Sequence, residues 1–388
     1  MPWRLVLLWF AGADLRITLL AVPPLLPLIH RSLGLNESGV AALTNLPVLL
    51  LGLGAIPGSF LIARFGPRRA LVGALLMLGV AASLRGAGSS APVLFTMTAL
   101  MGLGISFAQP AVPTLTRDWF PERISLVTGI WSNGLLVGEA LAASFSLPVV
   151  LPLFAGAWGP ALDVWGAVPL LTACGFAALR LERAPPLARI ARWLPDFASP
   201  VSWKLGIFQA AASLTYFGAN TFVPDYLHAV GRPGLVAACI SALNVAQIPA
   251  SLTIGIVPFR ILARPWVSAG VAVAMLAALA ALRFGGAPGA IAGTAVLGFC
   301  AAYVLVFSFA LPALLASGPD VARLSAATFT IGYTASFFTT LLAGAAWDAT
   351  QQPATAFLPV VAAALIVVVF GIALGKDALR SPYYAGSA

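Results

Sequence analysis

Charged residues are scarce in this chain of 388 residues, because only 9% of them are Asp, Glu, Lys or Arg. An ordinary soluble domain has about a quarter charged residues, whereas 60% of this chain is hydrophobic. Apolar runs of about 20 residues, the length that a helix needs to cross a bilayer, recur throughout. Strand-length alternation is absent, so the sequence predicts an all-α membrane protein and excludes a soluble domain or a barrel.

Residues that bind metals or perform catalysis are also few. The three cysteines (Cys174, Cys239 and Cys300) lie in apolar runs without ligand spacing, which favours packing over a disulfide or a metal site. The two histidines, His30 and His228, have no ligand-spaced partner. No nucleotide-binding, metalloprotease or Cys–His motif occurs. We therefore expect no enzyme, no catalytic residue, no metal and no cofactor.

Short polar breaks divide the chain into twelve apolar spans. The first begins almost at Met1 and has no small-residue cleavage site behind it, so we expect a retained helix and not a signal peptide. The predicted spans are 5–29, 38–63, 69–87, 92–116, 124–149, 161–180, 203–228, 235–258, 265–283, 289–315, 323–346 and 354–375.

The basic residues follow membrane topology. With the N-terminus in the cytoplasm, the outer side receives Arg31, Arg85, Arg232 and Arg283, Arg16 lies inside a span, and the remaining 16 of the 21 Lys and Arg fall on the inner side. This is the positive-inside bias. It accounts for the net charge of +9 without a nucleic-acid partner, and it predicts a multi-pass protein of the bacterial inner membrane with both termini in the cytoplasm.

The longest polar break, residues 181–203, separates two sets of six spans. Short sequences recur at a shift of about 200 residues, since RISLVT (123–128) returns as RLSAAT (323–328). Two six-helix halves in one orientation are the plan of secondary transporters. The predicted organisation is a six-helix bundle over 1–181, a cytoplasmic linker over 182–202, and a second bundle with a short tail over 203–388.

The stretch GSFLIARFGPRRAL (58–71) and the six-plus-six plan resemble the major facilitator superfamily. In that family's gating loop, Arg64, Gly66, Arg68 and Arg69 fit the pattern, whereas Ser59 replaces a glycine and Ala63 an acid. The stretches LRITLLAVPPLLP (15–27), LTNLPVL (43–49), QPAVPTL (109–115) and GIWSNGL (129–135) resemble the cyanate-permease branch. The resemblance implies a cyanate transporter that works by alternating access.

Arg16 lies in the middle of the first span. At about 1.5 Å per residue it lies roughly 16 to 17 Å into a core of about 30 Å, where a charge needs a cavity or a partner. The guanidinium stays protonated and offers five donors, so we expect Arg16 to contact a small anion. The alternative is an arginine held by a carboxylate or by backbone carbonyls for packing or gating.

Two acids lie at comparable depth. Asp14 is about 200° around the helix from Arg16, so it faces elsewhere, as a structural pair or a proton site, while Gly12 is expected to share the cavity face of Arg16. Glu139 is predicted to be the resting counter-ion of Arg16 or a proton-coupling carboxylate. The alternative is a protonated glutamate at a helix contact.

Further cavity candidates are neutral, which suits a monovalent anion. They are Asn45, Gln109 and Trp131 in the first half, and Tyr216, Asn220, Tyr303 and Tyr333 in the second. Each is alternatively a packing residue. Prolines are expected to bend the spans and glycines to allow close helix contacts; they are Pro23, Pro24, Pro27, Pro110 and Pro113, and Gly102, Gly104, Gly129, Gly134 and Gly138.

The leading hypothesis is therefore a transporter of a small monovalent anion. The runner-up is a multidrug or nitroimidazole-type exporter that relies on the aromatics and Glu139 and in which Arg16 is structural. A channel or a membrane enzyme is disfavoured by the repeat and by the missing chemistry. The expected partners are the substrate anion and the lipid bilayer, with protons open as a coupling ion, and the expected state is a monomer.

Overall fold

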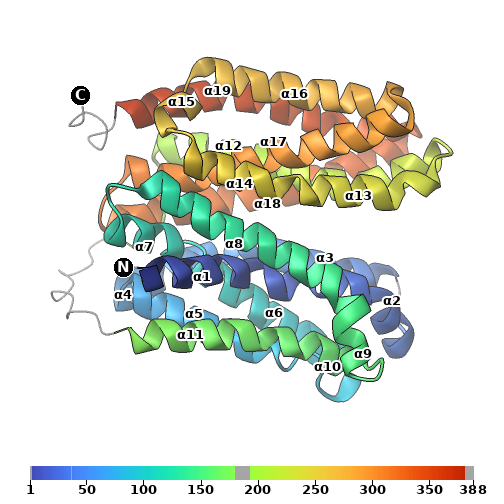
Figure 1. Ribbon diagram of the computed structural model, residues 1–388, viewed down its shortest axis with the longest axis horizontal. Coiled ribbons are helices and arrows are strands. Elements are labelled where there is room, and N and C mark those ends of the chain that lie inside the picture. The colour runs from blue at the N-terminus through green and yellow to red at the C-terminus, as the bar shows by residue number, and fades with distance from the viewer. Residues whose placement is uncertain (1, 36, 180–192, 381–388) are drawn as a thin grey trace. The chain divides into compact units, whose positions relative to one another are not determined.

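The computed structural model describes residues 2–35, 37–179 and 193–380, and every element in these ranges is helical. The helices within each half run side by side along one general direction (Figure 1). The first half contains α1 (Pro2–Leu20), α2 (Val22–Leu33), α3 (Glu37–Leu53), α4 (Ala55–Phe65), α5 (Pro67–Ala82), η1 (Ala87–Ser89), α6 (Ala91–Ala108), α7 (Ala111–Trp119), α8 (Ile124–Phe145), η2 (Ser146–Val150), α9 (Leu151–Leu153), α10 (Trp158–Asp163), η3 (Val164–Gly166) and α11 (Ala167–Ala178). The second half contains α12 (Pro200–Ala229), η4 (Pro233–Leu235), α13 (Val236–Val245), α14 (Gln247–Ile256), α15 (Phe259–Leu262), α16 (Pro265–Phe284), α17 (Gly286–Leu315), α18 (Pro319–Thr350), η5 (Pro353–Phe357) and α19 (Leu358–Leu379).

Helices occupy all twelve predicted spans. Within the described ranges, nine helices are long and apolar enough to cross a membrane, and the bent pair Leu46–Leu53 with Ala55–Phe65 makes ten. The other two predicted spans hold α5, which is short at 16 residues, and α12, which has 30 residues but carries more polar side chains. Helices suit this environment because they satisfy their own backbone groups inside a bilayer.

Several spans are interrupted where proline removes a backbone donor. α1 ends at Leu20 and α2 begins at Val22, since Pro23 and Pro24 have no N–H for the preceding turn. The break between α6 and α7 likewise falls at Pro110. These breaks were predicted, whereas the 47° bend between α3 and α4 was not.

The outward faces of the helices carry large apolar side chains. Leu153, Leu171, Ile256 and Phe284 are each more than 70% exposed. In water such surface would be an aggregation hazard, but lipid tails are as apolar as these side chains. The distribution therefore agrees with a multi-pass membrane protein.

The chain divides into two compact units. Unit 1 comprises Met1–Pro121, Ile130–Pro195 and Gly318–Ala326, and unit 2 comprises Glu122–Gly129, Asp196–Ser317 and Ala327–Ala388. The segment Glu122–Gly129 contains the repeated sequence RISLVT, and Gly318–Ala326 contains the first four residues of its counterpart RLSAAT. Residues 182–192 of the predicted linker lie outside the described residues, and 193–195 belong to unit 1.

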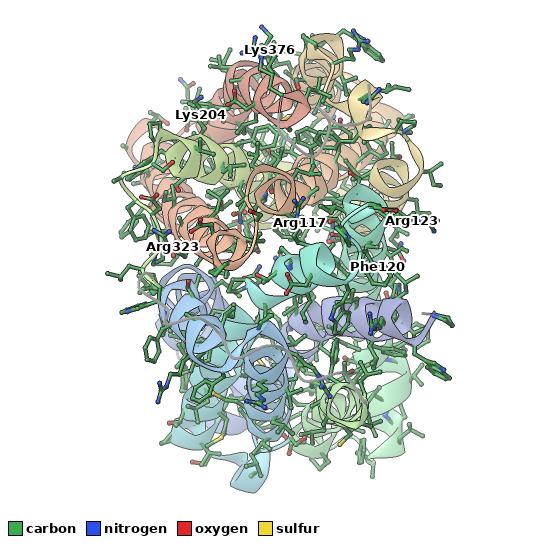
Figure 2. The ribbon with its side chains drawn as sticks, turned by 90° about the vertical axis from the view of Figure 1, so that its left-hand side faces the viewer. Arg117, Phe120, Arg123, Lys204, Arg323 and Lys376 are labelled. Carbon is green, nitrogen blue, oxygen red and sulfur yellow. The ribbon has the colours of Figure 1, made fainter. Side chains whose placement is uncertain are left out.

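The basic side chains that Figure 2 labels lie near helix ends. In unit 1, Arg117 lies in the last turn of α7 and Phe120 ends that helix. In unit 2, Lys204 near the start of α12 forms an ion pair with Asp377 of α19, with 3.3 Å between Nζ and Oδ2. Figure 2 shows Lys204 and Lys376 at the same end of unit 2, which agrees with the packing of α12 on α19.

Candidate functional site

The site is built on an unusually close contact between α1 and α8 in unit 1. A Cβ atom on Gly12 would lie 1.8 Å from the carbonyl oxygen of Trp131, and one on Gly134 would lie 2.0 Å from that of Trp9. Only glycine permits such an approach of two backbones. The predicted role of Gly134 is confirmed, but Gly12 packs against α8, so the expectation that it faces a cavity is wrong.

Arg16 and Glu139 are both buried in this region. Arg16 on α1 and Glu139 on α8 are each 4% exposed, and the guanidinium interacts electrostatically with the carboxylate. Gly138, next to Glu139, brings α8 against the backbone of Ala13. The structure therefore brings the two predicted residues into one neighbourhood, with an opposite charge to offset the cost of burying the arginine.

Asp14 faces a different neighbour. It is fully buried and interacts with the hydroxyl of Thr172 on α11, while that hydroxyl donates to the Val168 carbonyl at 3.0 Å. Neither Asp14 oxygen meets full hydrogen-bond geometry with a donor in the described part of the chain. The helical-phase argument thus separates Asp14 from Arg16 as predicted.

Arg85 is a second buried cation of unit 1, and this corrects its assignment to the outer surface. Its side chain is 0% exposed, and Nη2 donates to the backbone carbonyl of Thr18 on α1 at 2.7 Å. The Asp163 carboxylate interacts with it electrostatically. Position in the sequence indicated a loop, but the loop folds back between α1 and α10.

The first half also contains three predicted polar cavity residues, Asn45, Gln109 and Trp131. Gln109, at the break between α6 and α7, is 2% exposed, and Trp131 on α8 is completely buried. The Asn45 side chain lies outside the described residues. Gln109 and Trp131 therefore both belong to the interior of unit 1.

Unit 2 holds a network of neutral polar side chains. The Tyr216 hydroxyl donates to Oδ1 of Asn244 at 3.0 Å, and Asn244 Nδ2 donates to Oδ1 of Asn220 at 3.2 Å. Gln247 Nε2 also donates to Asn244 Oδ1, at 3.3 Å. Tyr216 and Asn220, both predicted, are thus brought together on α12. Asn244, which links them to α13, was missed, although it lies one position from the repeat equivalent of Asn45.

Tyr303 and Tyr333 lie elsewhere in unit 2. Tyr303 stacks on Phe307 with ring centroids 6.1 Å apart, and its hydroxyl donates to the Leu262 carbonyl at 3.3 Å. Tyr333 is fully buried and stacks on Phe329. The ring contact and the backbone hydrogen bond of Tyr303 are those that the packing alternative describes.

The predicted gating loop shows one strong contact. Arg68 donates through Nε and Nη2 to the Phe176 carbonyl at 3.0 and 2.7 Å, and through Nη2 to those of Ala177 and Leu179 at 3.0 and 2.6 Å. These carbonyls end α11 and have no partner within the helix, so a cation there is favourable.

The rest of the loop is exposed or binds a residue of the predicted linker. Arg64 and Arg69 are exposed, and Gly66 takes a positive φ of 83° between α4 and α5. Ser59, which replaces the family's glycine, donates to the Trp193 carbonyl at 2.9 Å. Among the residues that the structure describes, no cluster of three or more His, Cys, Asp or Glu is placed to hold a metal.

Long apolar helices, a glycine-tight interior and buried charges define a polytopic membrane transporter. A family model described as Major Facilitator Superfamily matches residues 7–346. The chain belongs to the major facilitator superfamily, and it is a transporter and not an enzyme. The family and the fold predicted from the sequence are confirmed.

Three proteins illustrate the relationship. The cyanate transport protein CynX of Escherichia coli (strain K12) is 27% identical over 241 residues, which is 62% of this chain and 62% of that protein. The 2-nitroimidazole transporter of the same organism is 27% identical over 373 residues, 94% of this chain and 93% of that protein. The fucose:proton symporter FucP of E. coli shares the fold, with a TM-score of 0.69 at 14% identity over 96% of this chain and 98% of that chain.

Proposed function

We propose that the chain is a secondary active transporter of a small monovalent, cyanate-like anion, and that Arg16 is the anion contact. The observation that carries this proposal is the buried pair of Arg16 and Glu139 on the contact between α1 and α8. A guanidinium cannot give up its proton, so its burial at midplane requires an anionic partner in every state. Glu139 is that partner at rest, and the substrate takes over when it binds.

The small number of positive charges available to bind an anion supports a monovalent substrate. The polar groups that the structure gathers in unit 2 are a phenol and amides, not a second arginine. A dianion would need further positive charge to compensate its greater desolvation cost. The cyanate transport function of CynX, a relative over 62% of the chain, agrees with a small anion.

The remaining parts of the proposal follow from the family's plan. The two units alternate access to the site, and Glu139 carries the coupling proton when it is released from Arg16. The positive-inside bias supports a bacterial inner membrane with both termini in the cytoplasm. The transporter works as a monomer.

A second candidate is transport of a nitro-heterocycle. The match to the 2-nitroimidazole transporter extends over 94% of this chain, whereas that to CynX covers 62%. A nitro group presents two oxygens to a guanidinium much as a carboxylate does. Arg16 is therefore compatible with this substrate too.

Uptake in proteoliposomes tests the proposal. Wild-type protein is assayed with radiolabelled cyanate, nitrate and 2-nitroimidazole, alongside Arg16→Ala and the control Arg31→Ala, whose side chain is exposed at the end of α2. We expect anion uptake to fall at least about a hundredfold in Arg16→Ala and to stay near wild type in the control. Undiminished cyanate uptake in Arg16→Ala would refute the proposal, and uptake of 2-nitroimidazole alone would favour the second candidate.

A further inference from the structure

Arg85 is the buried charge that the proposed function does not use. Its guanidinium is 0% exposed, yet Nε and Nη1 have no hydrogen-bond partner in the described part of the chain. Burying a cation whose donors lack partners is costly, and a neutral residue could make a single hydrogen bond at lower cost. The location of the one hydrogen bond that Arg85 makes indicates why the buried residue is charged.

That hydrogen bond holds the end of α1. Nη2 donates to the carbonyl of Thr18, in the last turn before the helix breaks at Ala21. The Thr18 carbonyl is one of the last four of α1, which have no partner within that helix, and Pro23 and Pro24 have no N–H to offer the carbonyls of Leu19 and Leu20 that follow it. A positive charge at a helix C-terminus is also favoured by the helix dipole. Arg85 therefore caps the break that the prolines create.

The support behind Arg85 is rigid. The neighbouring Gly86 donates its N–H to Oδ1 of Asp163 at 2.6 Å, and a Cβ on Gly86 would lie 2.3 Å from Cα of Gly159. The loop is thereby fixed against α10. Trp158, Ala161 and Leu162 of α10 belong to one buried apolar cluster with Ala21 and Val22 at the break.

Arg16 lies two residues before Thr18 on the same helix, so the position of the break sets the position of the anion contact. We infer that Arg85 is a positioning residue that pins the break of α1 to the corner formed by the loop after α5 and α10, and so fixes the depth and orientation of Arg16. The link to transport rests on the proposed function, whereas the pinning of the break does not.

The variants are Arg85→Met, which removes the positive charge and the hydrogen-bond donors, and Arg85→Lys, which keeps the charge and a donor but loses the planar guanidinium. Arg31→Met, at an exposed basic site of α2, is the control. Hydrogen exchange of peptides covering residues 17–24 reports the break without reference to any substrate. Uptake kinetics of the wild-type substrate report KM and kcat separately.

In Arg85→Met we expect faster hydrogen exchange that is confined to residues 17–24. We also expect about a tenfold higher KM, with kcat within about twofold of the wild type. Arg85→Lys should partly restore both the exchange rate and KM, and Arg31→Met should change neither.

Unchanged exchange at 17–24 would overturn the inference, and so would an unchanged KM despite faster exchange. A uniform rise of exchange across unit 1 would also overturn it, by indicating general destabilisation. If Arg85→Met does not fold, Arg85→Lys must show the local exchange increase and a raised KM, or the inference fails. If the wild type transports no anion, the proposed function fails while exchange still decides the pinning.

Discussion

The interiors of the two units handle polar groups in opposite ways. Among its described residues, unit 1 buries four charged side chains, Asp14, Arg16, Arg85 and Glu139, and it brings its helices together through glycines. Unit 2 gathers neutral amides and a phenol that satisfy one another by hydrogen bonds around Asn244. Charges in a low-dielectric interior are costly unless they are paired. In the proposed function, unit 1 therefore carries the ion chemistry, and the neutral network of unit 2 contributes specificity by hydrogen bonding.

The largest effect is expected from the glycine contact of unit 1. Leucine at Gly12 would meet the Trp131 carbonyl oxygen, 1.8 Å from its Cβ, so α1 and α8 would separate. We expect a loss of at least about 3 kcal/mol in the free energy of unfolding, measured by thermal unfolding in detergent. Gly73→Leu is the control, because nothing lies within 4 Å of a Cβ there. Equal destabilisation of both variants would contradict the assigned contact.

The next effect concerns the charge of unit 1. In the proposed function Glu139 is the resting counter-ion of Arg16, so in Glu139→Gln the substrate anion would no longer compete with a carboxylate. We expect about a tenfold lower KM for the anion, with a lower turnover because release slows. A pH series of uptake from 5 to 8 completes the measurement. If Glu139→Gln keeps both the wild-type KM and the wild-type pH dependence, neither the counter-ion role nor the coupling role survives.

A smaller effect is expected in unit 2. Asn244→Leu removes the acceptor of Tyr216 and Gln247 and the donor to Asn220. These side chains are partly exposed except Gln247, so water replaces part of the loss. We expect about 1 to 2 kcal/mol less stability and a change in the ratio of KM values for cyanate and nitrate. Thr253→Val, which loses a hydroxyl bond to the Pro249 carbonyl, should leave that ratio unchanged.

The smallest effect is expected at the ion pair that joins the ends of α12 and α19. Lys204 and Asp377 are each 36% exposed, and solvent-screened pairs contribute little. Lys204→Met should change the free energy of unfolding by about 0.5 kcal/mol or less. A loss comparable to that of Asn244→Leu would show that surface charge matters as much in unit 2 as its polar network.

The fold was predictable because the features that determine it form recognisable patterns along the sequence. Apolar runs of bilayer length, the repeat at about 200 residues and the prolines near positions 23 and 110 each leave a local pattern, and the helices and breaks follow them. The bend between α3 and α4 left no such pattern, since prolines in membrane helices are common and only some of them coincide with a break.

The site was predictable only in part. Helical phase separates Asp14 from Arg16, and depth associates Arg16 with Glu139, so both relations could be expected. Arg85 was assigned to the outside because a basic residue at the end of a span usually marks a loop; that this loop returns into the interior depends on Gly86 and Gly159 meeting across the fold. Tyr303 bonds a backbone carbonyl, a partner that spacing does not reveal.

Ser59 and Arg323 both bind the part of the predicted linker that the structure describes. Ser59 holds the Trp193 carbonyl at 2.9 Å, and Nε of Arg323 holds that of Leu194 at 2.9 Å, so the chain is anchored on unit 1 up to Pro195. α12 begins at Pro200. Both hydrogen bonds are accepted by backbone carbonyls, which every residue carries. The identities of Trp193 and Leu194 can therefore change in sequence without loss of these two bonds.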